Sequence, residues 1–532
     1  MIPVLTAAEM RQADRQTIDE IGLPGVVLME NAGSAVAEAI RRKFPAVRRP
    51  SFLCGRGNNG GDGFVVARKL ADLRPDVYLL GIRDDVRDDA RVHLDVLERS
   101  VGKVIEVADA LAWERTRERL RRSDLVVDCL LGTGLKDAPI GLFADAIKDM
   151  TRLRELGVPV VSVDLPSGVP SDTGDLPWPV VPASMTVTFA CPKYGHVLPP
   201  ACEWIGELVT ADIGIPKAVL ARQDPKLLLL EAADALHAFA ERSPDSHKGT
   251  YGHVLVIAGS IGKTGAAVLA ATAALRSGSG LVTVATPANA LPLVASGRPE
   301  VMTEPIPVTA SGTLSREACD RVLSLAASRD AVVLGPGLGQ DPGVREFVRE
   351  FVRRCPVPLL VDADGLNALA PPAGGRLRGA LDALELGRPT VLTPHPGEMA
   401  RLTGLRPDEV QKRRLESARS LARETGALVV LKGHRTLVVD PAGRAAVNPT
   451  GNPGLATAGT GDVLSGMIGA LLARHDGWEA STAGVYLHGL AGDVAAARRG
   501  QASLVAGDVL DALPDALRSL APDAGGRTSP TT

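Results

Sequence analysis

The 532-residue sequence has few aromatic side chains, little net charge and no long apolar run. Phe, Trp and Tyr make up only 3% of it, which argues against a surface that stacks nucleic-acid bases. With 59 Lys and Arg against 62 Asp and Glu, its net charge of −3 gives no electrostatic reason to bind nucleic acid or an anionic membrane. No run of about 18 apolar residues occurs, so we expect no membrane span.

Cysteine is also sparse, and its spacing carries no motif. The six cysteines are scattered without a CxxC pair or a zinc-binding spacing, which predicts small buried thiols in a reducing compartment. The N-terminal sequence lacks the charged start and apolar centre of a signal peptide, because Glu9 and Arg11 interrupt it. We therefore expect a cytoplasmic protein.

The sequence is rich in short Val, Leu and Ile runs, each followed by a glycine-rich turn and then a helical pattern. These runs are Ser51–Cys54, Leu125–Cys129, Val158–Asp164, Val254–Ala258, Val332–Leu334, Pro358–Asp362 and Leu428–Leu431. Continuous apolar runs of this length are typical of strands buried on both faces of a parallel sheet. Segments such as 265–277 and 407–425 have helical length and composition. The alternation predicts an α/β fold.

The alternation occurs in two series, which predict two domains. Thr6 and Glu9 have the spacing of a capping box, so the first helix begins there. The first series runs to about residue 216, residues 217–226 lack glycine turns, and a new strand–loop–helix series starts at His253. We predict an N-terminal domain over 1–216, a linker over 217–230, a second domain over 231–518 and a flexible tail over 519–532.

The first candidate site is the sequence GRGNNGGDG at 55–63, between an apolar strand and a helical segment expected over 64–70. Glycines allow close approach of the backbone to a ligand, and N–H groups at a helix start favour phosphate. The segment is neither GxGxxG nor a Walker loop. A tight strand–helix turn is the structural alternative, but two Asn, two Gly and an Asp in a row favour ligand binding.

Two further loops follow strand ends in the same half of the chain. One is GTGLK at 132–136, and the other runs from Asp164 to Ser167. Loops after the carboxyl ends of parallel strands gather at one edge of the sheet, where ligands bind. Oxygen ligands from Asn59, Asp128 and Ser167 would suit an alkali or alkaline-earth cation. Asp128 taken alone fits a cap or turn residue equally well.

The motifs GRGNNGGDG, DCLLGTG, DLPSGVPSDTGD, TFACPKYGH and ADIGIP, spread over about 8–216, together resemble the NAD(P)H-hydrate epimerase family. The resemblance implies a Rossmann-like three-layer domain that binds hydrated nicotinamide dinucleotide and potassium. It implies potassium ligands at Asn59, Asp128 and Ser167. It implies dinucleotide contacts at Asn58, Asn59, Gly60, Gly61, Asp62, Gly132, Thr133, Gly134, Leu135, Lys136, Asp137, Ala138 and Asp164.

The implied epimerase reaction interconverts the R and S forms at the hydrated ring carbon, which needs a group that handles protons there. Asp164 is the preferred candidate. Lys193 and Lys136 are weaker candidates, because lysines more often lie on a solvated surface or bind phosphate.

The second half carries its most specific motif, NPTGNPGLATAGTGD, at 448–462, directly before an apolar helix expected over 463–473. Glycines and Thr460 at a helix start expose N–H groups that can hold phosphate charge. Asp462 would repel that charge, so we predict that it is a base directed at a substrate hydroxyl. The alternative is a carboxylate placed at the helix start by the helix dipole.

Other loops of the second half follow strands in the same way. GSIGKTGAA at 259–267 is too short for a Walker loop and fits either helix–strand packing or a ligand. The cations of 432–436 would suit nucleotide phosphates. His395, held between two prolines, is a site candidate. Asp362 and Asp364 offer carboxylates for Mg²⁺ or for a helix start.

The motifs GSIGKTGAA, GPGLG, VDADGLNAL, LTPHPGEMARL, LKGHRT and NPTGNPGLATAGTGD, over about 247–473, resemble the ADP/ATP-dependent NAD(P)H-hydrate dehydratase family, which has a ribokinase-like α/β fold. The resemblance implies that the hydrated dinucleotide contacts Ala266, Gly337, His395 and Asp462. It implies that the nucleotide contacts Lys432, Gly433, His434, Arg435, Thr436 and Gly461, with Mg²⁺ bridging its oxygens. Bacterial members resembling this chain generally use ADP, and eukaryotic ones ATP.

The two resemblances together predict a bifunctional NAD(P)H-hydrate repair enzyme, both isomerase and lyase. Phosphorylation turns the ring hydroxyl into a good leaving group, and its elimination restores NAD(P)H with release of AMP and phosphate. The epimerase would supply the S form on which the dehydratase acts. We expect only small-molecule ligands, and a homo-oligomer.

Two other functions remain compatible with the sequence. One is a ribokinase-like kinase for a small alcohol such as a vitamin precursor, which a stable phosphorylated product would reveal. The other is a non-catalytic nucleotide sensor or partner-binding protein, which would not turn over hydrated NADH.

Overall fold

The computed structural model describes residues 1–135, 137–239, 242–309, 312–371 and 388–520. The chain divides into two compact units: a first unit of Ile2–Leu227, and a second unit of Leu228 onward together with Met1. The segment expected as a linker, 217–230, contains helix α8 and strand β9. Lys136 and most of the expected tail lie outside the described residues, and residues 519 and 520 close the last helix, α21.

The first unit is built from alternating strands and helices, as the sequence predicts. Its strands are β1 (Ile2–Val4), β2 (Pro50–Cys54), β3 (Asp76–Leu80), β4 (Ile105–Val107), β5 (Leu125–Cys129), β6 (Val160–Val163), β7 (Met185–Phe189) and β8 (Glu207–Ala211). Its helices are α1 (Ala7–Gln16), α2 (Gly25–Lys43), α3 (Asn58–Lys69), α4 (Asp88–Ser100), α5 (Ala110–Leu120), α6 (Leu142–Glu155), α7 (Tyr194–Val197) and α8 (Lys217–Ala221).

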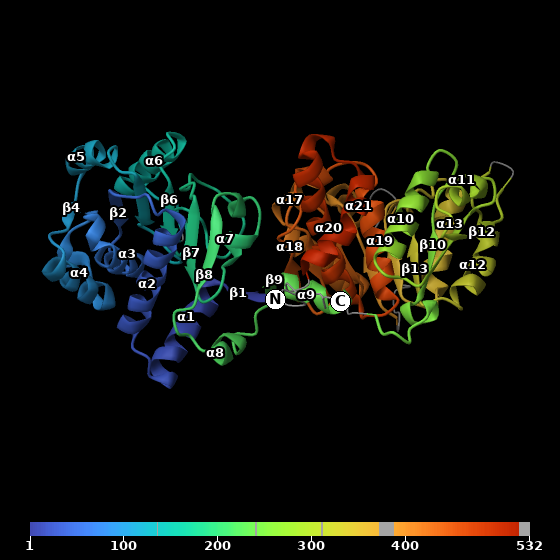
Figure 1. The fold of residues 1–532 in the computed structure, drawn as a ribbon, viewed down its shortest axis with the longest axis horizontal. Coiled ribbons are helices and arrows are strands. Elements are labelled where there is room, and N and C mark those ends of the chain that lie inside the picture. The colour runs from blue at the N-terminus through green and yellow to red at the C-terminus, as the bar shows by residue number, and fades with distance from the viewer. Residues whose placement is uncertain (136, 240–241, 310–311, 372–387, 521–532) are drawn as a thin grey trace, which may run out of the picture. The chain divides into compact units, whose positions relative to one another are not determined.

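The sheet of the first unit runs in the order β4-β3-β2-β5-β6-β7-β8, with every pair parallel. Strands β2 and β5 are buried along their whole length, because helices cover both faces of the sheet. Helices α2, α3 and α4 lie on one face and α5 and α6 on the other (Figure 1). Thr6 caps α1 and forms the predicted capping box with Glu9.

The second unit repeats the strand–helix alternation on a larger sheet. Its strands are β9 (Leu227–Leu229), β10 (His253–Ile257), β11 (Leu281–Pro287), β12 (Met302–Ile306), β13 (Ala331–Leu334), β14 (Leu359–Val361), β15 (Thr390–Leu392), β16 (Leu428–Leu431), β17 (Leu437–Val439) and β18 (Ala445–Val447). Its helices are α9 (Ala232–Leu236), α10 (Thr264–Arg276), α11 (Leu291–Ala295), α12 (Cys319–Ala326), α13 (Pro342–Arg354), α14 (Asp364–Leu369), α16 (Pro396–Thr403), α17 (Pro407–Lys412), α18 (Arg414–Thr425), α19 (Thr460–Leu472), α20 (Gly477–Arg499) and α21 (Ala506–Leu520).

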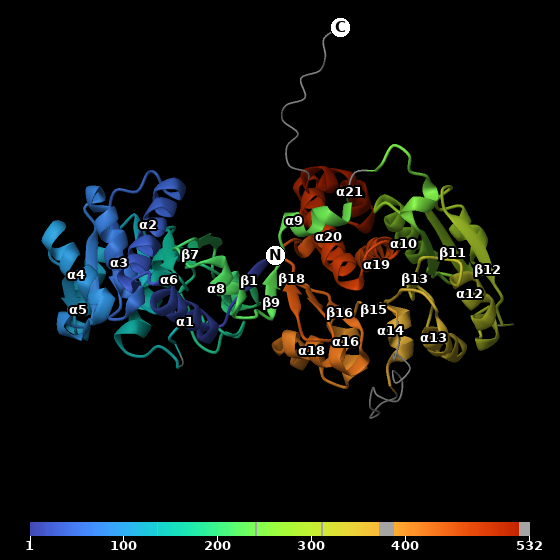
Figure 2. The same cartoon turned by 90° about the horizontal axis from the view of Figure 1, so that it is seen from below.

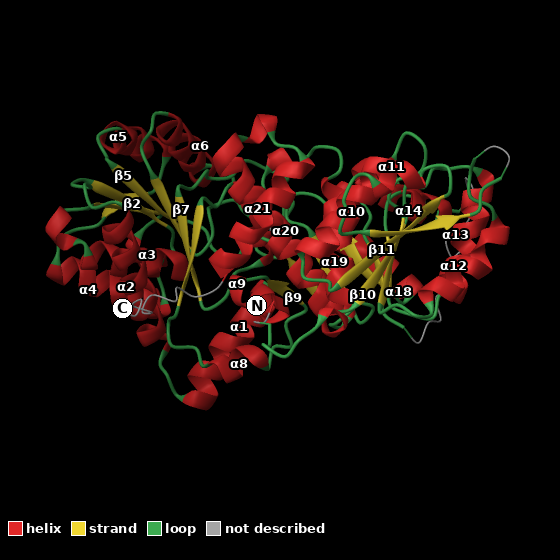
Figure 3. Ribbon diagram, turned by 45° about the vertical axis from the view of Figure 1, so that its right-hand side comes forward, coloured by secondary structure: helices red, strands yellow, loops and turns green. Residues whose placement is uncertain are grey.

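The central strands of this sheet run in the order β16-β15-β14-β13-β10-β11-β12, all parallel, and β17 and β18 extend it as antiparallel strands. Helices α10, α19, α20 and α21 cover one face, and α13, α14, α16 and α18 cover the other (Figure 2). Figure 3, in which strands are yellow and helices are red, also shows the strands lying between helices. The predicted α/β fold class is confirmed.

Helix α19 is apolar on nearly all sides, which explains its place at the centre of this layer. Its residues from Val463 to Leu472 are buried against α10 and the sheet. All six cysteines are buried, as expected, and none of them forms a disulfide. No described helix combines the length and apolar character needed to cross a bilayer.

Candidate active sites

In the first unit the predicted ligand loops follow the neighbouring strands β2, β5 and β6, so they meet at one edge of the sheet. The NNGGDG sequence forms the first turns of α3, which begins at Asn58, and not a loop before a helix at Phe64 as expected. Its N–H groups at Asn58 and Asn59 are therefore the exposed start of a twelve-residue helix.

Packing within the unit explains two glycines of this motif. A Cβ on Gly60 would lie 1.9 Å from the carbonyl oxygen of Gly55, and one on Gly61 would lie 2.9 Å from Ala90. Both positions therefore require glycine whether or not a ligand is bound. Neither glycine lines the cavity beside this helix.

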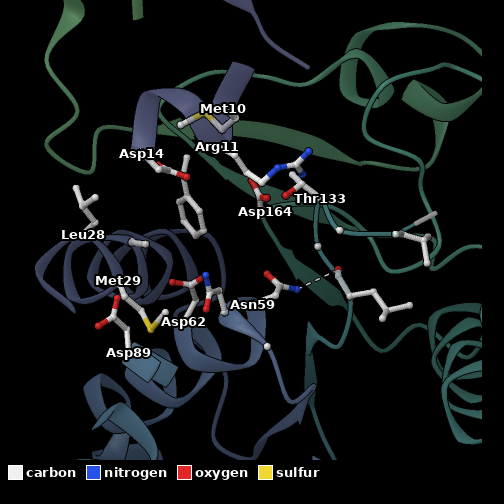
Figure 4. A pocket seen from close by; sticks show the side chains of 18 of the residues that line it. Met10, Arg11, Asp14, Leu28, Met29, Asn59, Asp62, Asp89, Thr133 and Asp164 are labelled. Atoms are coloured by element: carbon white, nitrogen blue, oxygen red, sulfur yellow. Dashed lines mark hydrogen bonds between the residues drawn. The ribbon is translucent and has the colours of Figure 1, made fainter. Parts of the chain in front are cut away.

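That cavity, of about 880 Å³, opens at the same edge of the sheet (Figure 4). The predicted residues that line it are Asn58, Asn59, Asp62, Gly132, Thr133, Gly134, Leu135, Asp137 and Asp164. Ala138 is exposed and is not among its lining residues. The predicted contact at Lys136 lies outside the described residues.

Helix α1 supplies lining residues that no sequence motif indicated: Met10, Arg11 and Asp14. Asp14 follows Met10 by four residues, so both lie on one face of the helix, next to the buried Ala7 and Ala13. The sequence signal that could have indicated Asp14 is an acidic residue on the apolar face of an amphipathic helix.

Asp164 and Lys193 form a buried ion pair at the cavity wall. The Lys193 ammonium donates to Asp164 Oδ1 at 2.6 Å, to Thr188 Oγ1 at 2.8 Å and to the carbonyl oxygen of Phe189 at 3.2 Å. Burial acts to raise the pKa of Asp164, but Lys193 outweighs it, and the pKa lies below its usual value. Asp164 is therefore ionised, and all three ammonium protons of Lys193 are engaged.

His196 fixes the backbone around this ion pair. Its Nδ1 accepts the backbone N–H of Lys193 at 2.9 Å, so its Nε2 donates to the carbonyl oxygen of Asp164 at 2.8 Å. Burial and then Lys193 lower its pKa to about 3, so His196 is neutral and positions the pair.

Asp14 and Asp62 line the same cavity, but unlike that of Asp164 their pKa values are raised. Burial raises the pKa of Asp14 to about 6. Of the smaller contributions, the charge of Lys193 lowers this pKa and the charge of Asp164 raises it. Burial, followed by the charges of Asp164 and Asp14, raises the pKa of Asp62 well above its usual value. The cavity thus places Asp164, which is held ionised, together with two carboxyl groups that retain protons more readily.

The three residues predicted to bind potassium lie at this edge around one buried carboxylate. Asp128 accepts hydrogen bonds from Ser167 Oγ at 2.5 Å, the Ser167 N–H at 2.8 Å and Ser162 Oγ at 3.0 Å. Burial nevertheless raises its pKa. Asn59 donates its amide N–H to the carbonyl oxygen of Leu131 at 3.1 Å, and its own Oδ1 is buried without a partner. A buried, unpaired oxygen beside a fully desolvated carboxylate fits a hard cation.

In the second unit the predicted loops follow β10, β13, β14, β15 and β16, which are consecutive in the sheet. Gly337 after β13 lies against the start of α10, because a Cβ on it would be 2.7 Å from the Lys263 carbonyl oxygen and 3.0 Å from Ala266 Cβ. Ser260 Oγ donates to the Gly337 carbonyl oxygen at 2.7 Å. The predicted contacts at Ala266 and Gly337 are therefore neighbours.

Asp462 lies in the first turn of α19, whose N-cap is Gly459. No side chain caps this helix, so Asp462 does not act as an N-cap. Burial and then the charge of Asp362 raise its pKa to about 6, although Lys432 acts in the opposite direction. This value suits a base that works near neutral pH.

Lys432, predicted to hold nucleotide phosphates, makes a buried ion pair within the unit. Its Nζ donates to Asp362 Oδ1 at 2.7 Å and lies 3.8 Å from Glu398 Oε2, while Ser465 Oγ donates to Asp362 Oδ2 at 2.6 Å. Burial acts to lower the pKa of Lys432, but Asp362 and Glu398 raise it above its usual value. A Cβ on Gly461 would be 3.5 Å from Nζ, so the ammonium lies beside the start of α19.

His395 lies next to Glu398 of this group, and the charge of Asp364 acts on Asp462. His395 Nδ1 accepts the N–H of Gly397 at 3.0 Å, so Nε2 carries the proton and lies 3.3 Å from Glu398 Oε1. Asp364 begins α14 and accepts from Lys263 Nζ at 3.1 Å and the Gly339 N–H at 2.9 Å. No group of three His, Cys, Asp or Glu suited to a metal occurs among the described residues.

The nucleotide-binding prediction at 432–436 falls on the turn after β16. Lys432 N–H donates to the Pro394 carbonyl oxygen at 2.9 Å, which ties this turn to the His395 loop. Thr436 Oγ1 donates to the Gly433 carbonyl oxygen at 2.9 Å, and Arg435 has a positive φ of 55°. These contacts hold the turn in shape, and from it Lys432 extends its ammonium toward Gly461.

Two known families match separate parts of the chain. The model of the NAD(P)H-hydrate dehydratase family matches residues 254–515, and that of the YjeF-related protein N-terminus matches residues 25–195. The bifunctional NAD(P)H-hydrate repair enzyme Nnr of Moorella thermoacetica is 46% identical over 526 residues, covering 97% of each chain. The protein of that name from Escherichia coli is 35% identical and covers 95% of this chain and 92% of its own length.

Among solved structures, the ADP/ATP-dependent NAD(P)H-hydrate dehydratase of Bacillus subtilis, co-crystallised with ATP and Mg²⁺, is 34% identical. It covers 55% of this chain and 99% of its own, with a TM-score of 0.47.

Proposed function

Because the chain belongs to the family of bifunctional NAD(P)H-hydrate repair enzymes, we propose that it converts both forms of hydrated NADH and NADPH back to NAD(P)H. The first unit would interconvert the R and S forms, and the second would dehydrate the S form with ADP. The observation that supports this most strongly is that each unit gathers its own strand-end site, with Asp164 in one and Asp462 in the other.

The first site offers room and charge for a dinucleotide. Its cavity of about 880 Å³ is open to the start of α3, whose free N–H groups favour phosphate. Asp164, ionised beside Lys193, can accept a hydrogen bond from the substrate and favour positive charge that develops on the ring. Thr133 and Gly134, in the loop after β5, also line this cavity.

Potassium, when bound by Asn59, Asp128 and Ser167, would supply a fixed positive charge at this edge of the sheet. We expect replacement of potassium by choline to slow epimerisation and to leave dehydration of the S form unchanged, because these three residues belong to the first unit. Asp128→Asn should have the same selective effect. Both rates are measured on one preparation, and an equal fall in both would contradict the assignment.

In the second site the ring hydroxyl would be phosphorylated before it leaves. Asp462 would take the hydroxyl proton, and the first N–H groups of α19 would hold the transferring phosphoryl group. Lys432 adds positive charge at the same point. Mg²⁺ would be held mainly by the nucleotide oxygens, which is usual for this ion and agrees with the lack of a protein metal cluster among the described residues.

We expect ADP to be the better phosphoryl donor, giving AMP and phosphate. The measurement is the initial rate of NADH formation from S-hydrate with ADP and with ATP at equal concentrations. A clearly higher rate with ATP would contradict the prediction that ADP is the better donor.

The compartment is proposed to be the cytoplasm. All six cysteines are buried and none forms a disulfide, which agrees with a reducing environment.

A further inference from the structure

Asp14 is one of the residues lining the first cavity that no sequence motif indicated. It projects from α1 into the cavity (Figure 4), and the described residues give its carboxyl group no hydrogen-bond or ion-pair partner. The same holds for the carboxyl group of Asp62, which is only 8% exposed. Two desolvated carboxyl groups without partners in one cavity are costly, so they are suited to a ligand that supplies hydrogen bonds.

Epimerisation at the hydrated carbon sets a geometric requirement that Asp164 alone does not meet. The hydroxyl must leave one face of the ring and water must return on the other, so a proton is donated on one face and accepted on the opposite face. Asp164 is held ionised by Lys193, so it is a poor donor. Lys193 already donates to three oxygens and is 1% exposed.

Asp14 and Asp62 meet this requirement by their positions. Asp14 comes from α1 and Asp62 from α3, and these helices border the cavity on opposite sides (Figure 4). Asp164, at the end of β6, lies to the right of both in the same view and lines the same cavity. A ring that enters the cavity beside Asp164, between α1 and α3, would present one face to each of the other two carboxyl groups.

We propose that Asp14 is a catalytic base of the epimerase, which accepts a proton on one face of the hydrated ring while Asp62 donates one on the other. This assignment rests on the epimerase function proposed above. Asp62 protonates the departing hydroxyl, the carbon–oxygen bond breaks and water leaves. The lone pair of the ring nitrogen forms a carbon–nitrogen double bond, and the planar cation is balanced by Asp164.

Water then adds to the opposite face, forms the new carbon–oxygen bond and gives its proton to Asp14. One water leaves and one adds, and exchange with solvent restores both carboxyl groups. In the reverse direction the two residues exchange roles, which a reversible isomerisation requires. In the direction described, the reactive form has Asp14 ionised and Asp62 protonated, in agreement with a pKa of Asp14 of about 6 and a pKa of Asp62 well above its usual value.

The charges around Asp14 determine the expected pH dependence. Those lining its cavity are Arg11, Arg56, Asp62, Asp89, Asp137, Asp164 and Lys193, and α8, which packs on α1, begins with Lys217. Burial is the largest influence on Asp14 and raises its pKa. The rate of epimerisation should fall as the pH drops through about 6, because Asp14 then becomes protonated and cannot accept a proton.

The test compares Asp14→Asn with Asp14→Glu and with Asp19→Asn in the full chain. Asp19 follows α1, is exposed and does not line the cavity, so it controls for the loss of one carboxylate. Epimerisation of R-hydrated NADH should fall about 10²–10⁴-fold in Asp14→Asn and lose its dependence on pH near 6. Asp14→Glu should recover part of the rate, and Asp19→Asn should match the unmodified chain.

Dehydration of the S form by the same preparations shows that each variant is folded and should be unchanged. A near-normal rate or a retained acidic limb in Asp14→Asn would overturn the proposal. Absence of epimerisation by the unmodified chain would instead refute the proposed function of the first unit, so the two failures are distinguishable.

Discussion

Replacing Asp462 by asparagine is expected to lower the rate of dehydration about 10²–10⁴-fold and at the same time to make the second unit more stable at neutral pH. The rate falls because the amide cannot accept the hydroxyl proton. Stability rises because burial, followed by Asp362, makes ionisation of Asp462 unfavourable and raises its pKa to about 6. A carboxyl group with a raised pKa in the folded chain destabilises that chain once it is ionised.

The pH dependence of this stabilisation follows from the same shift. Below about pH 4 the carboxyl group is neutral in both the folded and the unfolded chain, so the two proteins should have similar free energies of unfolding. As the pH rises through 6 the unmodified chain should lose up to roughly 2–3 kcal/mol relative to Asp462→Asn, at about 1.4 kcal/mol per pKa unit. Denaturant unfolding at several pH values measures the difference.

The expected loss of dehydration rate in Asp462→Asn has its own control. The dehydration rate of the unmodified chain should fall as the pH drops through about 6, because the base becomes protonated. Epimerisation by Asp462→Asn should be normal, since Asp462 lies in the second unit. A variant that dehydrates at a near-normal rate and is less stable at neutral pH would indicate a purely structural carboxylate at the helix start.

Removal of the Lys432 charge should strongly destabilise the second unit. The Lys432 side chain is 18% exposed, and its ammonium donates to the 1% exposed Asp362 at 2.7 Å and lies 3.8 Å from Glu398. In Lys432→Met these carboxylates keep their burial but lose their counter-charge. Breaking a buried ion pair from one side typically costs about 3–5 kcal/mol in the free energy of unfolding.

A double-mutant cycle separates the ion pair from the packing of the lysine. Adding Asp362→Asn to Lys432→Met should recover part of the lost free energy, because the unpaired charge is then removed. Lys412→Met is the surface control, since Lys412 is exposed at the end of α17, and it should change little. If Lys432→Met and Lys412→Met were equally stable, Lys432 would not be compensating the buried carboxylates.

The order of strands and loops could be predicted from local patterns. Runs such as Leu125–Cys129 and Leu428–Leu431 are strands with the predicted bounds, because residues buried on both faces of a sheet leave continuous apolar runs. The capping box of Thr6 and Glu9 is likewise local. Boundaries were less predictable: α3 begins at Asn58, and the segment 407–425 is two helices, α17 and α18, separated by Arg413.

Contacts between distant parts of the chain could not be predicted in this way. Lys432 pairs with Asp362 across 70 positions, and Asp14 reaches a cavity formed by loops more than forty residues away. Nothing near Lys432 in the sequence distinguishes a phosphate ligand from a buried ion pair. Gly60 and Gly61 belong to a recognisable motif, yet neighbouring backbone and side chains alone exclude a Cβ there.

We propose that two separate sites, one in each unit, act in sequence on hydrated NADH. The most direct measurement mixes R- and S-hydrated NADH with ADP and Mg²⁺ and follows NADH by its absorbance, for the unmodified chain and for Asp462→Asn. The unmodified chain should convert both forms to NADH, whereas Asp462→Asn should form almost none and still interconvert R and S. Failure of the unmodified chain to form NADH from the S form with either ADP or ATP would contradict the claim.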